Sequence, residues 1–124
     1  MSDSPAKESL KSLVFFGKDF MIGSRVEGVS RNHSLTFLRV DKKEALHTLS
    51  PQPRLVLFDI ATTGDDLPQM VSGLKNIYPE ISLVGLAFHT DEISLEKGKR
   101  AGLDALITRS HLVDGLNRIL EKRQ

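Results

Sequence analysis

Five short apolar runs alternate with amphipathic segments along the 124-residue chain, and this alternation limits the fold more than any other feature. The runs at 13–16, 55–58 and 83–88 are almost continuously apolar, as in parallel strands that helices cover on both faces. The run at 35–40 alternates more strongly between polar and apolar residues, which suits an edge strand. With the short run at 105–107, the sequence predicts five strands.

Apolar residues at helical spacing fill the segments between these runs, and they predict helices around 22–29, 45–49, 67–78, 92–101 and 112–120. The stripe of the fourth helix is thin, consisting of Ile93, Leu95 and Ala101, so we expect this helix to be the least buried. Strand–helix units joined by right-handed crossovers form a doubly wound, three-layer α/β sandwich. We expect a parallel sheet in the order 2-1-3-4-5, in one domain over residues 12–124 that follows a flexible polar tail, residues 1–11.

Composition excludes several classes of protein. The chain has no cysteine, which rules out disulfides, thiolate chemistry and cysteine-bound metals. Its 17 basic and 16 acidic residues leave a net charge of +1, which argues against a nucleic-acid partner. No apolar run approaches the roughly 18 residues of a membrane span, and the N-terminal segment is polar. We therefore expect a cytoplasmic protein with neither a nucleic-acid nor a membrane partner.

Motifs of catalysis and cofactor binding are also missing. The four histidines have no metal-ligand spacing, and no glycine-rich turn follows the first apolar run to hold a nucleotide phosphate. There is no nucleophile elbow and no pair of carboxylates at a catalytic spacing. The sequence therefore predicts a protein that is not an enzyme and needs no cofactor.

Ligands of open parallel sheets bind outside the carboxyl ends of the strands, near the point where the strand order reverses. Asp59 directly follows the run 55–58, and carboxylates at this edge serve metal or phosphoryl chemistry. The alternative is structural: Asp59 caps the next loop or pairs with Lys18 or Arg109. The other residues expected in a pocket at this edge are Lys18, Asp19, Ala87, His89, Thr90 and Arg109.

The sequence resembles, over residues 12–122, the receiver domain of bacterial two-component response regulators. The resemblance is carried by the repeated strand–helix layout, by Leu55-Val56-Leu57-Phe58-Asp59 and by Ala101-Gly102-Leu103-Asp104-Ala105-Leu106-Ile107. It implies a CheY-like, flavodoxin-like fold with Asp59 at the phosphoacceptor position. It also implies a partner surface around the fourth helix, where the basic residues are Lys97, Lys99 and Arg100.

The sequence departs from the family wherever receivers handle phosphate. Gly17-Lys18-Asp19 stands where the family has a pair of acidic residues that hold magnesium, so Lys18 would repel the metal and only Asp19 remains. The family's threonine or serine falls on Ala87, and its lysine falls on Arg109. The loop predicted at 60–66 lacks the family's methionine-proline step. We therefore expect a degenerate receiver with weak or no phosphorylation.

Three functions are compatible with this resemblance and with the departures from it. The first is a stand-alone signalling module without an output domain, which binds a histidine kinase, a phosphotransfer protein or a downstream effector and needs no cofactor. The second is a working phosphorelay receiver: a kinase or phosphotransfer protein phosphorylates Asp59, Mg²⁺ binds Asp19 and Asp59, and Arg109 pairs with the product. The third is a small-ligand or flavin-binding domain of the same architecture. A homodimer is the other partnership that the sequence leaves open.

Overall fold

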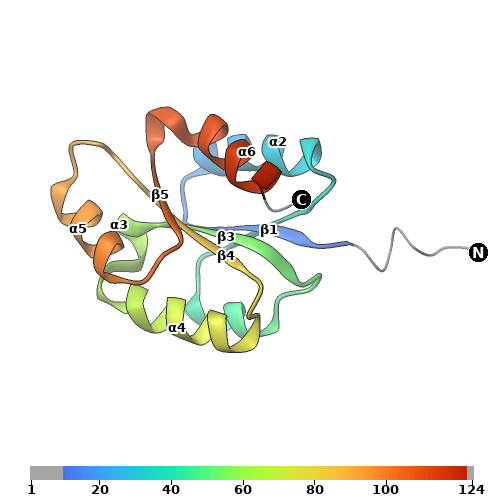
Figure 1. The fold of residues 1–124 in the computed structure, drawn as a ribbon, viewed down its shortest axis with the longest axis horizontal. Helices are drawn as coiled ribbons and strands as arrows, with labels where there is room; N and C mark the ends of the chain where they lie inside the picture. The colour runs from blue at the N-terminus through green and yellow to red at the C-terminus, as the bar shows by residue number, and fades with distance from the viewer. Residues whose placement is uncertain (1–9, 123–124) are drawn as a thin grey trace, which may run out of the picture.

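The computed structural model describes residues 10–122, which form a single parallel sheet of five strands in the order β2-β1-β3-β4-β5 (Figure 1). The predicted fold class and strand order are confirmed. Most of the predicted tail, residues 1–9, lies outside the described residues. Lys11 is already tied to the sheet, because its carbonyl accepts a hydrogen bond of 2.9 Å from the Thr36 N–H. The strands are β1 (Ser12–Phe16), β2 (Thr36–Val40), β3 (Pro53–Asp59), β4 (Ser82–Ala87) and β5 (Ala105–Thr108).

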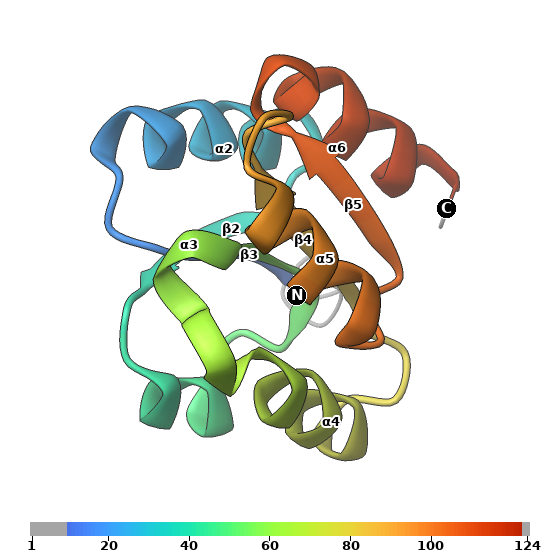
Figure 2. The same cartoon turned by 90° about the vertical axis from the view of Figure 1, so that its left-hand side faces the viewer.

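Helices cover both faces of the sheet, as Figures 1 and 2 show. One face carries α2 (Phe20–Asn32) and α6 (Leu112–Lys122), and η3 (Arg109–His111) leads into α6. The other face carries η1 (Lys43–Thr48), α3 (Ile60–Thr63), η2 (Gly64–Asp66), α4 (Leu67–Ile77) and α5 (Glu92–Arg100). No helix among residues 10–122 is long and apolar enough to cross a membrane.

Alternate residues of each central strand enter two separate cores. Leu13 and Phe15 of β1 pack toward α2 and α6, together with Leu116, whereas Val14 and Phe16 pack toward α4. Every residue of β1 and β4 is buried, because side chains point alternately to two covered faces. Continuous apolar runs therefore correspond to the inner strands, as the sequence predicts.

The helix predicted at 45–49 is wrong in type, because this segment is the 3₁₀ helix η1 and buries only Leu46. Leu49 is already extended, with φ −73° and ψ 133°. Ser50 precedes Pro51, and the proline ring disfavours the α conformation in the residue before it. The segment is therefore too short to form a regular α-helix.

The loop predicted at 60–66 is instead helical, with α3 and η2 directly after β3. Ile60 is buried in the core on the α4 side, and the Thr63 hydroxyl donates a hydrogen bond of 3.0 Å to its carbonyl. Ile60 fits because two neighbouring residues are glycines: a Cβ on Gly85 or Gly98 would lie 2.7 or 2.9 Å from its Cδ1. Burial of this side chain fixes the segment that follows Asp59.

The apolar stripe predicted for the fourth helix is wrong in part, since Ile93 is 71% exposed. Helix α5 instead packs through Ser94 and Gly98, which are buried, and Ala101 at its end enters the core. A Cβ on Gly98 would lie 2.6 Å from Leu106 Cδ2. Small residues thus let α5 approach the sheet closely, and its large apolar side chains are left nearer the surface.

Candidate functional site

Asp59 is the last residue of β3, where it lies beside Leu86 of β4 at the carboxyl edge of the sheet. Gly17, directly after β1, closes one side of this position. A Cβ on Gly17 would lie 3.0 Å from Asp59 Cβ and 2.6 Å from Phe15 Cζ, so a larger residue would push into the ring. The end of β1 therefore holds the Asp59 side chain in a half-buried position.

Burial dominates the electrostatics of Asp59. Loss of water raises the pKa of its carboxyl above the ordinary value of 3.8, because the charged form is poorly solvated. The Arg109 charge, the Ala61 backbone N–H and the Thr62 hydroxyl lower the pKa in turn, but they do not offset burial. Asp59 is consequently a desolvated carboxylate without full charge compensation.

Asp19 has both carboxylate oxygens engaged. Its Oδ1 accepts a hydrogen bond of 3.0 Å from the Ile22 N–H and caps the start of α2. Its Oδ2 accepts from Arg109 Nη2 at 2.8 Å. The Ile22 N–H is the largest cause of a lowered Asp19 pKa, and Arg109 adds to it.

Arg109 therefore pairs with Asp19 and not with Asp59. The guanidinium also lies over the Phe88 ring, 4.1 Å from its centre, and so joins the start of α2 to the turn after β4. Among the ion pairs of residues 10–122, none involves Asp59 or Lys18, and the Lys18 side chain is exposed. The structural alternative of an Asp59 pair with Lys18 or Arg109 is therefore wrong.

The other residues predicted for the pocket separate into two groups. Ala87 is buried at the end of β4, beside Thr108 of β5. Because alanine has no hydroxyl, this position supplies none to the site. His89 and Thr90 are exposed in the following turn, and neither side chain forms a hydrogen bond or ion pair with the residues that the structure describes. The structure thus brings together Asp59, Asp19 and Arg109, but it does not bring His89 or Thr90 to them.

The basic residues predicted as a partner surface lie on α5. Lys97 Nζ pairs with Asp65 of η2 at 3.2 Å, and Arg100 Nε pairs with Glu96 at 3.1 Å. Lys99 is exposed. Two of these three cations therefore already have partners within the chain.

Arg39 is a residue near the site that spacing along the sequence does not reveal. Its Nη1 donates a hydrogen bond of 3.2 Å to the Asp19 carbonyl, and its guanidinium lies 4.8 Å from the centre of the Phe20 ring. Gly23 makes room for it, because a Cβ there would collide with the Arg39 guanidinium. The strand order was the available signal, since it places Arg39 beside Phe15 of β1.

A divalent cation does not fit the residues at this edge. Magnesium needs several oxygen ligands, usually including one or two carboxylates that are free to bind it. Both oxygens of Asp19 already accept hydrogen bonds, one of them from the Arg109 cation, and the preceding residue, Lys18, is an exposed cation and not a carboxylate. Within the described part of the chain, no group of three or more acidic or histidine side chains could hold a metal ion.

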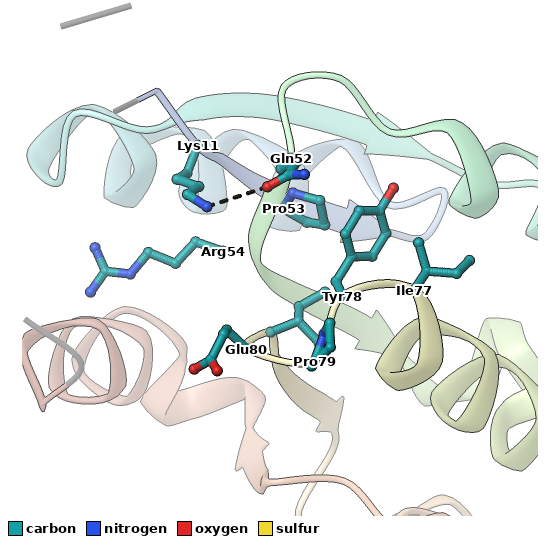
Figure 3. Close-up of a pocket in the computed structure, with 9 residues that line it drawn as sticks. Lys11, Gln52, Pro53, Arg54, Ile77, Tyr78, Pro79 and Glu80 are labelled. Carbon is teal, nitrogen blue, oxygen red and sulfur yellow. Dashed lines mark hydrogen bonds between the residues drawn. The ribbon is translucent and has the colours of Figure 1, made fainter. Parts of the chain in front are cut away.

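A hollow lies at the amino end of the strands, opposite the edge of the sheet that carries Asp59 (Figure 3). It has a volume of about 290 Å³, and Tyr78, Pro53 and Pro79 contribute apolar surface to it. Lys11 Nζ at its margin donates a weak hydrogen bond of 3.4 Å to Gln52 Oε1. Because ligands of open parallel sheets bind at the carboxyl ends of the strands, the edge at Asp59 remains the better candidate for a functional site.

Solved structures that superpose on this chain include receiver domains of response regulators, among them that of nitrogen regulatory protein C, with a TM-score of 0.70 at 19% identity. A CheY-like protein, tadZ, from Pseudomonas aeruginosa PAO1 superposes with a TM-score of 0.73 at 16% identity, over 92% of this chain and 99% of that one. A response regulator from Thermotoga maritima gives a TM-score of 0.72 at 15% identity, over 92% and 97%. The chain therefore has the receiver fold.

A longer protein, NtrX from Brucella abortus, gives a TM-score of 0.71 at 21% identity. This chain is covered over 92% of its length but spans only 28% of NtrX. No protein-family model matches the sequence, and no curated protein matches it. The similarity therefore extends to the fold and not to the activity of any one of these proteins.

Proposed function

We propose that the protein is a receiver-like signalling module of the cytoplasm that acts by binding other proteins and is not an enzyme. The observation that carries the proposal is the Arg109–Asp19 ion pair of 2.8 Å. It places a guanidinium on the carboxylate that a phosphoaccepting receiver would use for magnesium. The partners would be signalling proteins such as a histidine kinase, a phosphotransfer protein or a downstream effector.

Charge and burial at Asp59 support weak or absent phosphorylation. Phosphoryl transfer develops negative charge, which magnesium and nearby cations normally neutralise. Here the nearest guanidinium is held by Asp19, Ala87 offers no hydroxyl, and Asp59 is a desolvated carboxylate. These features favour a site that works without phosphate, as does the absence of a fitting magnesium site.

The test is to record amide NMR shifts of the wild type and of Asp59→Asn with magnesium chloride and beryllofluoride, an analogue of the acyl phosphate. We expect no saturable shift at residues 17–19, 59–62 or 87–90 at millimolar magnesium. Saturable shifts that spread to α5 and vanish in Asp59→Asn would contradict the proposal. They would establish the working phosphoacceptor, with Mg²⁺ on Asp19 and Asp59, in its place.

A further inference from the structure

An open groove lies between η1 and α4, on the face of the sheet opposite α2 and α6. Its volume is about 310 Å³, and its floor is apolar, formed by Leu46 of η1 and by Met70 and Leu74 of α4. These three side chains belong to the core and are at most 7% exposed. Sites for small molecules usually measure about 300–1,000 Å³ and are lined mainly by apolar groups. The size and the floor of the groove therefore suit a small ligand.

The shortness of η1 keeps this groove open. The two elements that border it, η1 and α4, lie side by side (Figure 2). Because η1 has six residues and buries only Leu46, it covers little of the neighbouring surface of α4. The groove is therefore formed by the course of the backbone and does not depend on the rotation of one side chain.

Gly73 adds to the open space of the groove. It lies inside α4 and lines the groove, and a Cβ at this position would meet no atom within 4 Å. Glycine weakens a helix relative to alanine, and the glycines Gly85 and Gly98 are explained by close contacts with neighbouring side chains. At Gly73 the missing side chain instead leaves space that a ligand can enter.

Polar side chains that can bind a ligand surround the apolar floor. Glu44 and His47 of η1 and Gln69 of α4 line the groove and are exposed. None of these three side chains forms a hydrogen bond or ion pair with any residue from 10 to 122. Lys43, by contrast, is paired, because its Nζ lies 3.5 Å from Asp66 Oδ2. Since the charges of that pair neutralise each other, Glu44 is left as the unpaired carboxylate of the groove.

We propose that the groove binds a small organic cation, namely an amine carried on an apolar ring or a short apolar chain. The apolar part lies on the three floor side chains, in the space beside Gly73, and the ammonium group pairs with Glu44. A ligand carboxylate would be repelled by Glu44 and would find Lys43 already paired. The inference goes beyond the proposed function, because this ligand site uses neither Asp59 nor a protein partner.

The experiment is an NMR titration with a panel of arylalkyl and cycloalkyl amines, together with the alcohol and the carboxylate of each carbon skeleton. We expect saturable amide shifts with amines, and they should map to residues 43–48 and 66–74. The dissociation constant of a binding amine should be about two- to fivefold lower than that of its alcohol, as for an exposed ion pair. This difference should disappear in Glu44→Gln, and the matched carboxylate should bind more weakly than the alcohol.

Gly73→Leu tests the place of binding, because the new side chain would occupy the open space of the groove. It should weaken binding of the amine at least about tenfold. Gly28→Leu is the matched control: Gly28 lies inside α2, where a Cβ also meets nothing within 4 Å, and it does not line the groove. The control should leave binding unchanged, and amide spectra should show that all variants keep the fold.

Three results of the titrations would overturn the proposal: no saturable shift in the groove with any amine, carboxylates that bind there as tightly as amines, or undiminished binding in Gly73→Leu. A dimer in sedimentation that Gly73→Leu dissociates would also overturn it, since the occupant would then be a second copy of the chain. The titrations contain neither magnesium nor beryllofluoride, so the ligand site and the proposed function can fail separately.

Discussion

The Asp59 carboxyl lowers the stability of the folded protein at neutral pH. Its pKa is raised by burial above the 3.8 of an ordinary aspartate, so the folded state holds the proton more tightly than the unfolded chain does. Stability is therefore lost as the pH rises from 3.8 through the folded-state pKa. A neutral side chain of the same shape avoids this loss.

We accordingly expect Asp59→Asn to unfold at a higher temperature than the wild type at pH 7. The difference should shrink as the pH falls and disappear well below 3.8, where the wild-type carboxyl is protonated in both states. Thermal unfolding followed by circular dichroism over a pH series measures it. Asp65→Asn is the control: Asp65 is exposed and makes only a surface ion pair with Lys97, so its effect should be small at all pH values. A destabilised Asp59→Asn at pH 7 would refute the prediction.

Two residues explain the poor magnesium site, and both can be changed. Lys18→Asp adds a carboxylate beside Asp19, and Arg109→Lys replaces the forked guanidinium with a single ammonium that competes less well for Asp19. The double variant should show saturable amide shifts at residues 17–19 and 59 on addition of millimolar magnesium chloride.

Calcium chloride at the same concentration serves as the comparison, and the double variant with Asp59→Asn should lose the response. If the double variant binds magnesium no better than the wild type, Lys18 and Arg109 are not what prevents binding.

Sequence predicted the position of Asp59 in the fold better than the pairing of the charged residues around it. Asp59 was located because a strand end and the strand order fix a backbone position. Whether Arg109 pairs with Asp19 or with Asp59 depends on the orientation of side chains that, for Arg109 and Asp19, are 90 residues apart in the sequence. The periodicity of apolar residues carries no information about that orientation. Nor could spacing show that Phe20 and Met21 are exposed, since apolar residues at the start of a helix usually suggest burial.

At the scale of elements, α5 illustrates what apolar periodicity misses. The helix approaches the sheet through Ser94 and Gly98, and small residues do not register as an apolar stripe. The long α4, by contrast, buries Met70, Val71 and Leu74 at helical spacing and was predicted within a residue at its end. Large apolar side chains at helical spacing indicate in the sequence which face of a helix is buried. Close packing through glycine, by contrast, can be recognised only in the structure.

The packing of α5 gives a prediction that compares the higher helix propensity of alanine with the space available for its Cβ. Alanine is better than glycine within a helix by about 1 kcal/mol, so Gly28→Ala in α2, where a Cβ meets nothing within 4 Å, should stabilise the protein. Gly98→Ala should destabilise it, since its Cβ would lie 2.6 Å from Leu106 Cδ2 and overpacking costs about 1–3 kcal/mol. Urea unfolding of both variants measures the difference. Equal stabilisation by both substitutions would mean that α5 moves away from the sheet at little cost.

At the scale of the whole molecule, one sheet supports two cores and should couple their unfolding. Leu116 of α6 is fully buried on one face, and its truncation to alanine should cost about 2–5 kcal/mol. The chain has no tryptophan and one tyrosine, Tyr78, which packs on the opposite face. In Leu116→Ala, the urea midpoint from Tyr78 fluorescence should fall as far as the midpoint from circular dichroism. Separate midpoints would show that the two layers unfold independently.

The fold as a whole was predictable because alternation of strands and helices leaves few arrangements of short, right-handed connections. Where prediction failed, at η1 and α3, a local effect overrode the pattern. Pro51 limited the first segment, and the second became helical because Ile60 found space beside Gly85 and Gly98.

The place of Arg39 on the outermost strand also bears on solubility. Strand β2 ends the sheet, so one side of its backbone is open to pairing with a strand of another molecule. Arg39, the fourth of the five residues of this short strand, is its one exposed residue, and its guanidinium packs against aromatic rings. A charge on an edge strand discourages the stacking of strands from separate molecules that leads to aggregates. The same guanidinium that packs against Phe20 thus also protects the edge of the sheet from pairing with strands of other molecules.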